Sequence, residues 1–188
     1  MNLFGTNTAE TTNIVDLLRN DHIAVKALFH EFQSATDARE RRRIAEQALT
    51  ELIRHAGAEE EIFYPAIRDA RGTAETGALM DEANEEHHVA KVLIRELEAM
   101  REVDARYRAK FTVLSELVKH HVTEEESEIF PLARTSGLDL EKLGAALVAA
   151  KERAMARWRR PKAGNGKTAR RNGSTNGAKA KKRKRVRD

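Results

Sequence analysis

Four stretches of this chain place apolar residues three and four positions apart, which is the spacing of one face of an α-helix. The first stripe runs from Ile14 to Phe32, and similar stripes begin at Ala48, Met80 and Phe111. Strand signals are almost absent, and the 188 residues include only three prolines that would interrupt a helix. The pattern therefore predicts four long amphipathic helices, at about residues 13–35, 38–69, 75–102 and 105–134.

Short polar links such as "SATDA" and "REVDA" join these helices. Short links favour antiparallel neighbours, so we expect an all-α fold in which the four helices form an up-down-up-down bundle. A shorter fifth helix follows in "LDLEKLGAALVAAKERAMARW", with Asp139 as its N-cap. The bundle domain is expected to span residues 13–158, after a flexible N-terminus over residues 1–12.

The charge of the chain changes sign near residue 159. Residues 1–158 hold 21 Lys and Arg against 29 Asp and Glu, a net of −8, whereas residues 159–188 hold 13 against 1, a net of +12. The last segment also lacks apolar periodicity, so we expect residues 159–188 to form a disordered tail. Its charge suits non-specific contact with the phosphates of DNA or RNA, and a solubilising extension is the alternative. The densest candidate contacts are Lys181, Lys182, Arg183, Lys184 and Arg185.

The chain has neither a long apolar run nor a cysteine. No run of 18 apolar residues and no signal-peptide pattern occur, so we expect a cytoplasmic protein without membrane contact. The chain has no cysteine, which excludes disulfides, thiolate-bound iron–sulfur clusters and cysteine zinc fingers. Any metal ion must therefore be held by histidine and carboxylate side chains.

Two of the apolar stripes contain a histidine and a glutamate where an apolar residue is expected. His55 and Glu59 lie in "HAGAEEEIFYP", and His121 and Glu125 lie in "HVTEEESEIFP". In each motif the two residues are four positions apart, so they share one helix face and point the same way.

A sequence repeat adds one further histidine to each pair. The segment "DHIAVKALF" aligns with "EHHVAKVLI", so that His22 matches His87 while His55 matches His121. Counted from the connecting turns at about 1.5 Å per residue, His22 and His55 differ in height by only about 5 Å, and His87 and His121 lie at about equal depth. We therefore expect all four imidazoles to meet at one level inside the bundle.

This cluster predicts a bound cation. Unpaired carboxylates are costly to bury, and no Lys or Arg shares the two stripes nearby. A single His-x3-Glu pair is most often a surface ion pair, but here the pair occurs twice, in a repeat and in register with the apolar face. Four imidazoles and two carboxylates suit iron, manganese or zinc, and two ions can be held if each carboxylate bridges them. The candidate ligands are His22, His55, Glu59, His87, His121 and Glu125.

The remaining histidines are assigned no metal. His30 lies off the apolar stripe of its helix, and His88 falls on a polar line. A small rotation of the fourth helix would present His120 and Glu124 in place of His121, and the repeat alignment selects His121. Ferritin-like bundles place the carboxylate before the histidine, as Glu-x-x-His, so that scaffold is not supported.

Aromatic residues and prolines follow each His/Glu pair. We expect Pro65 and Pro131 to end or kink their helices just beyond the candidate ligands. Tyr64 and Phe130, beside the prolines, are expected to pack in the core, and the alternative is that they line the pocket of the ligands. The neighbouring acidic residues are explained either by a solvated helix face or by contacts that support the ligands from outside; they are Glu60, Glu61, Glu124 and Glu126.

The quoted His/Glu motifs, with "NDHIAVKALF" and "NEEHHVAKVLI", resemble those of the hemerythrin-like family, the HHE cation-binding domain, over about residues 14–155. The resemblance implies a four-helix bundle that holds a non-haem di-iron centre. It implies that one iron is bound by His22 and His55, that the other is bound by His87 and His121, and that Glu59 and Glu125 bridge them.

The resemblance also suggests a function. Oxygen carriers of the family have a further histidine one turn after the third-helix ligand, where this chain has Lys91, so the second iron should be more open to small ligands. We expect a protein that binds or reacts with oxygen, hydrogen peroxide or nitric oxide under oxidative or nitrosative stress, with catalase-like peroxide dismutation as one activity. The alternative is a non-catalytic iron or oxygen sensor whose basic tail contacts nucleic acid.

Overall fold

The computed structural model describes residues 13–159. Segments 1–12 and 160–188, which include Lys181 to Arg185, lie outside the described residues. Between them the chain forms α-helices and two short π-helical segments, η1 and η2. The elements are α1 (Ile14–Ser34), α2 (Ala38–Ala58), η1 (Glu59–Phe63), α3 (Tyr64–Arg71), α4 (Ala74–Ala99), α5 (Ala105–Glu124), η2 (Glu125–Ile129), α6 (Phe130–Arg134) and α7 (Leu140–Arg159).

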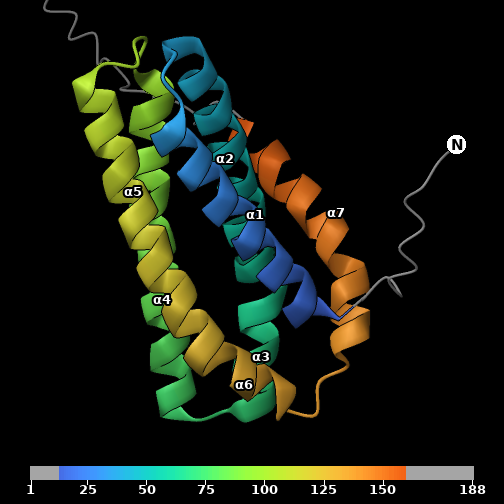
Figure 1. Ribbon diagram of the computed structural model, residues 1–188. Helices are drawn as coiled ribbons and strands as arrows, with labels where there is room; N and C mark the ends of the chain where they lie inside the picture. The colour runs from blue at the N-terminus through green and yellow to red at the C-terminus, as the bar shows by residue number, and fades with distance from the viewer. Residues whose placement is uncertain (1–12, 160–188) are drawn as a thin grey trace, which may run out of the picture.

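The predicted up-down-up-down bundle is confirmed. The segments α2, η1 and α3 follow one another without a break and form one long rod, and so do α5, η2 and α6. Helix α1 packs against the first rod and α4 against the second, and the two pairs meet through α2 with α4 and α1 with α5 (Figure 1). Residues 14–71 and 74–134 are called the first and second halves below.

A polar residue caps the start of each long helix. The side chains of Asn13, Asp37, Thr73, Asp104 and Asp139 each accept a hydrogen bond from a backbone N–H two or three residues later. Such a cap satisfies one of the amide groups that lacks a partner in the first helical turn. The expected role of Asp139 is therefore confirmed.

The fifth helix covers only one side of the bundle. Helix α7 packs along α1 and α2 and also contacts η1 (Figure 1). At its C-terminal end it reaches α4, where Trp158 contacts Arg95 and Glu98. Gly57 permits this close approach, because a methyl group at that position would overlap Ala154 of α7. The additional helix thus packs mainly on the first half of the bundle.

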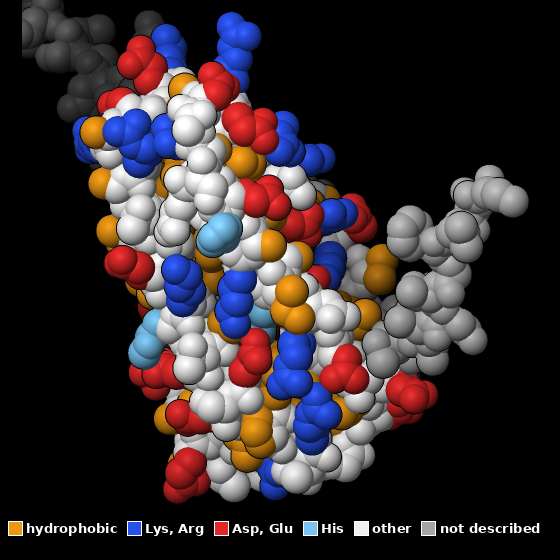
Figure 2. Space-filling model, viewed as in Figure 1, with side chains coloured by type: hydrophobic (Ala, Val, Ile, Leu, Met, Phe, Trp, Pro, Cys, Tyr) orange, Lys and Arg blue, Asp and Glu red, His pale blue; other side chains and the backbone are white. Residues whose placement is uncertain are grey.

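The apolar core consists of two clusters, one toward each end of the bundle. One contains Phe29, Phe32 and Phe111, and the other contains Phe63 and Phe130. Charged side chains of both signs cover the outer face seen in Figure 2. No helix within residues 13–159 combines the length and hydropathy needed to cross a bilayer.

The two prolines do not end their helices, because the helical backbone continues beyond Pro65 to Arg71 and beyond Pro131 to Arg134. The backbone widens to a π-turn before each proline, and the N–H of Tyr64 bonds to the carbonyl of Glu59, five residues back. Phe130 makes the same bond to Glu125. Each proline then falls in the first turn of a new helical segment, where its missing N–H costs nothing.

The π-turn in the first half also shifts the buried stripe. The sequence pattern extends the stripe of α2 through Ile62 and Ala66, but both are only partly buried. Phe63 and Ile67 are buried instead, because the wide turn adds one residue to the register.

Candidate metal centre

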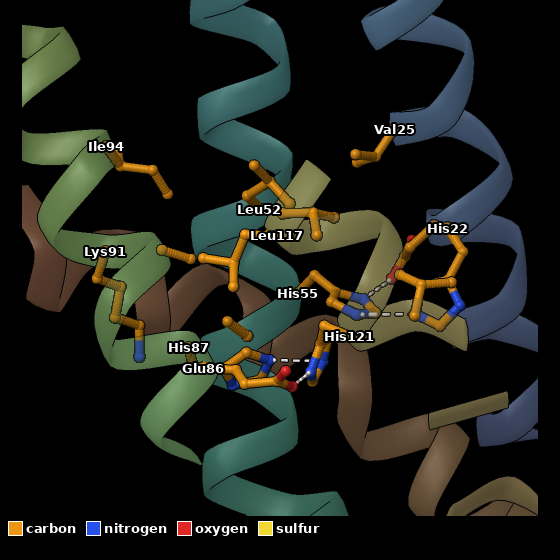
Figure 3. A pocket seen from close by; sticks show the side chains of 15 residues that line it. His22, Val25, Leu52, His55, Glu86, His87, Lys91, Ile94, Leu117 and His121 are labelled. Atoms are coloured by element: carbon orange, nitrogen blue, oxygen red, sulfur yellow. Dashed lines mark hydrogen bonds and ion pairs between the residues drawn. The ribbon is translucent and has the colours of Figure 1, made fainter. Parts of the chain in front are cut away.

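The structure brings the six candidate ligands together at one level of the bundle, between the two apolar clusters. All four histidines point toward one another, and each is at most 6% exposed (Figure 3). Both glutamates are fully buried, at the first position of their π-helical segments. The six come from six elements: His22 from α1, His55 from α2, Glu59 from η1, His87 from α4, His121 from α5 and Glu125 from η2.

The donor atoms form two groups. In the first group, the Nε2 atoms of His22 and His55 lie 3.1 Å apart. Glu59 Oε1 lies 3.0 Å from His55 Nε2, and Glu125 Oε2 lies 3.1 Å from His22 Nε2. These four side chains offer ligand atoms that all lie within 4.8 Å of one another.

The second group contains Glu59, His87 and His121. The Nε2 atoms of the two histidines again lie 3.1 Å apart, and Glu59 Oε2 lies 3.4 Å from His87 Nε2. One Glu59 oxygen therefore faces each histidine pair, whereas Glu125 offers its nearest donor atom to the group of His22 and His55. That Glu59 and Glu125 both bridge two ions stays a prediction.

Four carboxylates outside the centre fix the orientation of the four rings. Within the first half, Asp21 lies 3.2 Å from His55 Nδ1, and within the second half, Glu86 lies 2.7 Å from His121 Nδ1. Across the halves, His87 Nδ1 lies 3.1 Å from Glu60 and His22 Nδ1 lies 2.9 Å from Glu126. A carboxylate favours the ring tautomer that carries its proton on Nδ1, so the Nε2 lone pair of each ring points inward.

This arrangement fits a metal centre. Four inward lone pairs and two carboxylates would repel one another at these distances unless a cation lies among them. Within residues 13–159, no hydrogen-bond donor reaches three buried carboxylate oxygens, both of Glu59 and Oε2 of Glu125. The chemistry of the donors suits a metal ion of the iron, manganese and zinc type.

The pKa shifts follow from burial. Burial raises the pKa of Glu59 well above its usual value, and the nearby charge of Glu125 raises it further. Burial also disfavours the ionised form of Glu125, but the proximity of His22 and the charge of His121 outweigh it and lower the pKa of Glu125. Burial lowers the pKa of His87 to about 4, so its ring is neutral at neutral pH and free to donate its lone pair.

The three histidines that were assigned no metal lie outside the centre. His30, His88 and His120 are exposed. His120 Nε2 lies 3.1 Å from Glu124 and 3.8 Å from Glu86 on the surface. The alternative ligand pair, His120 with Glu124, therefore lies outside the centre.

The sequence pattern identified Glu60 and Glu126 as candidates to support the ligands from outside, but it did not identify Asp21, Glu86 or Lys151 in that role. Asp21 is bonded by Lys151 of α7, at 2.7 Å from its Oδ1 atom, and Glu60 is bonded by Lys91. Asp21 and Glu86 each directly precede a candidate histidine, and this repeated acid–His pair was the available signal. No comparable signal marks Lys151, because α7 has no counterpart in the repeat.

Comparison with known proteins places the chain in a family. The family model described as the hemerythrin HHE cation binding domain matches residues 13–133. The chain belongs to the hemerythrin HHE cation-binding family. The resemblance seen in the sequence motifs is thereby confirmed, and the His/Glu centre lies within the matched residues of this cation-binding domain.

Relatives of this HHE protein include longer chains. It is 33% identical over 124 residues to a DNA nickase of Nostoc sp., a match that covers 66% of this chain and 34% of the nickase. It is 28% identical over 121 residues to an uncharacterised hemerythrin-like protein of Schizosaccharomyces pombe, covering 64% and 59% of the two chains. The chain thus spans about a third and about three fifths of these relatives.

A solved structure shows the same fold. The crystal structure of a hemerythrin HHE cation-binding domain-containing protein from Mycobacterium kansasii matches with a TM-score of 0.63 and 23% identity. The match covers 77% of this chain and 88% of that chain.

Proposed function

We propose that this HHE protein is a non-haem di-iron protein that binds or reacts with oxygen, hydrogen peroxide or nitric oxide. The observation that carries the proposal is the position of Glu59, whose two oxygens face two separate histidine pairs. His22, His55 and Glu125 would hold one iron with Glu59, and His87 and His121 would hold the other. Iron in such a pair supplies reversible electron transfer to a small ligand.

The cavity beside the donor atoms suits a very small ligand. Its volume is about 30 Å³, and its walls include all four histidines. Apolar side chains line most of the remainder, among them Val25, Leu52, Ile94 and Leu117 (Figure 3). One water-sized molecule needs about 10–15 Å³ by this measure, so the cavity accommodates a molecule of two heavy atoms. Oxygen, nitric oxide and hydrogen peroxide all have that size.

The side chains of this protein would hold and shape the centre. Asp21, Glu60, Glu86 and Glu126 fix the ring orientations, while the apolar walls exclude bulk water from the cavity. Lys91 lines the cavity, but its ammonium group is bound by Glu60. Lys91 therefore supports the outer contact of His87 and leaves the cavity free for a ligand.

Peroxide dismutation is the activity that this centre supports best. Two molecules of hydrogen peroxide give one of oxygen and two of water, and a pair of irons can take up and return the two electrons without an external reductant. Iron-loaded protein given hydrogen peroxide should evolve oxygen, which an oxygen electrode measures. The Glu59→Ala protein should evolve none above the rate of free iron. Equal rates for the two proteins would refute the proposal for this activity.

A second candidate function is a metal-dependent, non-catalytic module or sensor that contacts nucleic acid. It is favoured by the 33% identity to a protein named as a DNA nickase and by the net charge of +12 over residues 159–188. The body, with its net charge of −8, should be repelled by phosphate. Deletion of residues 160–188 should therefore abolish retention of DNA in gel-shift titrations but leave the iron content unchanged. Nicking of supercoiled plasmid by iron-loaded protein would instead indicate catalysis on DNA.

A further inference from the structure

The four carboxylates that fix the ring orientations differ in the charge that holds them. Three of them form ion pairs with Lys or Arg side chains; the pairs are Asp21 with Lys151, Glu60 with Lys91, and Glu126 with Arg19 and Lys26. No Lys or Arg of residues 13–159 forms an ion pair with the fourth, Glu86. Glu86 is therefore the one member of this set that lacks a permanently charged partner in the described part of the chain.

Glu86 instead faces one histidine and one further carboxylate at the surface. Its Oε2 atom lies 2.7 Å from His121 Nδ1, whereas its Oε1 atom lies 3.8 Å from His120 Nε2. Glu124 follows His120 by one turn of α5 and lies 3.1 Å from the same nitrogen. The ligand atoms that Glu86, His120 and Glu124 offer all lie within 4.8 Å of one another. The chain thus carries the His-x3-Glu spacing twice at this point, once toward the centre and once, one residue earlier, toward solvent.

These donors suit a divalent metal ion. An imidazole and two carboxylates are all ligands of zinc, and iron and manganese accept the same atoms. Two ligands that each lie about 2.1 Å from an ion are about 3–4 Å apart, so the measured separations require only small movements. The side chains of His120 and Glu124 are 64% and 38% exposed and are free to make them. Within residues 13–159, Glu124 has no Lys or Arg partner either, so a cation would relieve the repulsion between the two neighbouring carboxylates.

We propose that Glu86, His120 and Glu124 bind a divalent metal ion at the surface, separate from the candidate di-iron centre. The ion takes the place of the Lys or Arg that holds each of the other three outer carboxylates. Because Glu86 contacts His121 with its second oxygen, an ion that holds Glu86 also fixes the orientation of that ring. The effect on His121 rests on the proposed di-iron function, whereas the surface site itself does not.

Zinc titration of the iron-loaded protein tests the site. The protein is first washed with a weak chelator, so that only the irons of the centre remain, and its iron content is measured. Calorimetry with Zn²⁺ should then show one binding step in the wild type. This step should be at least about tenfold weaker in His120→Ala and in Glu124→Gln, since each variant loses one of three ligands. The matched control is His88→Ala, because His88 is also exposed and adjoins a candidate ligand but lies outside the cluster; it should bind zinc like the wild type.

Iron release is the second measurement, because an ion without influence on the centre would not change it. Hydroxamate chelators prefer Fe³⁺ to Zn²⁺, so they remove iron while zinc is present. With Zn²⁺, one of the two irons should leave the wild type about tenfold more slowly, since the orientation of His121 is then fixed from outside. In His120→Ala, zinc should leave the rate of iron release unchanged.

The outcomes separate the two proposals. The absence of a zinc-binding step in the wild type would overturn the surface site, and so would a step of equal strength in His120→Ala, which would indicate an adventitious ion only. A zinc step that depends on His120 but has no effect on iron release would refute the link to His121. Protein that holds fewer than two irons before the titration would instead refute the proposed di-iron function, so the two failures are distinguishable.

Discussion

The two halves of the bundle are alike at the metal centre and unlike around it. Both provide a histidine pair, a glutamate that opens a π-helical segment, and an aromatic ring stacked on a histidine. Outside the centre, Asp21 of the first half is held by Lys151 of α7, whereas its counterpart Glu86 has exposed His120 as its neighbour. The arrangement of the candidate ligands is therefore the same in both halves, whereas the residues that hold the outer carboxylates differ.

This difference suggests that the two ion positions are unequal. The first position has four candidate ligands and is covered by α7, and the second has three. A ligand held rigidly by its outer contacts binds a metal more tightly than one that is free to turn. We therefore expect the His22/His55 position to fill first and the other position to carry the exchange with small molecules.

The largest change in metal content is expected when Glu59, which faces both histidine pairs, is replaced. Glu59→Ala should reduce the metal content from two ions towards one or none, because each histidine pair loses a carboxylate oxygen. Elemental analysis of the purified protein measures this change. His30→Ala and His88→Ala are matched controls on exposed histidines and should keep the full metal content. A Glu59→Ala protein that retains two ions would show that Glu59 is no bridge.

Removal of the metal should have the next largest effect, on stability. Without a cation, the inward lone pairs and carboxylates are left unneutralised, and a ligand that binds only the folded state adds stability by mass action. At a free metal concentration of about 100 times Kd this adds about 2.7 kcal/mol, or roughly 5–10 °C in melting temperature. Thermal melts of iron-loaded and chelated protein should differ by this amount. Equal melting temperatures would indicate that the cluster is satisfied without metal.

A smaller and one-sided effect is expected from α7. Lys151→Met removes the cation that holds Asp21, so the orientation of His55 should loosen and affinity for the first ion should fall by up to about tenfold. The second ion should bind as before, and the exposed Lys142 of the same helix offers the control substitution Lys142→Met. Equal weakening of both binding steps would contradict the proposed inequality of the two positions.

The smallest effect is expected at His120. Its side chain is 64% exposed and contacts Glu124 and Glu86 at the surface, so His120→Ala should leave the metal content at two ions. The same substitution at His121 should remove one ion. Loss of metal from the His120→Ala protein would show that the repeat alignment selects the wrong histidine.

The sequence pattern was sufficient for the helices and for the six inward residues. Helical periodicity identified the buried stripes. Periodicity alone allows either His120 or His121 as the inward ligand, and the repeat alignment selected His121. Neither π-turn was predicted. A proline after an apolar stripe normally indicates the end of a helix, and the sequence does not show that the turn before the proline widens.

The outer contacts were also beyond the sequence pattern. Asp21 lies one residue off the buried stripe and so looks like any exposed acid. Its role depends on Lys151, 130 residues later, and only the packing of α7 brings the two together. Such long-range pairs leave no periodic signal in a single sequence.

The most direct test of the account is anomalous diffraction at the iron edge from crystals of the iron-loaded protein. The account predicts two peaks, one beside His22 and His55 and one beside His87 and His121, with the Glu59 carboxylate between them. It also predicts that the peak beside His22 and His55 is the stronger one at limiting iron. A single peak shared by all four histidines, or a second ion without contact to Glu59, would contradict the central claim that this HHE bundle holds two unequal ions on one shared carboxylate.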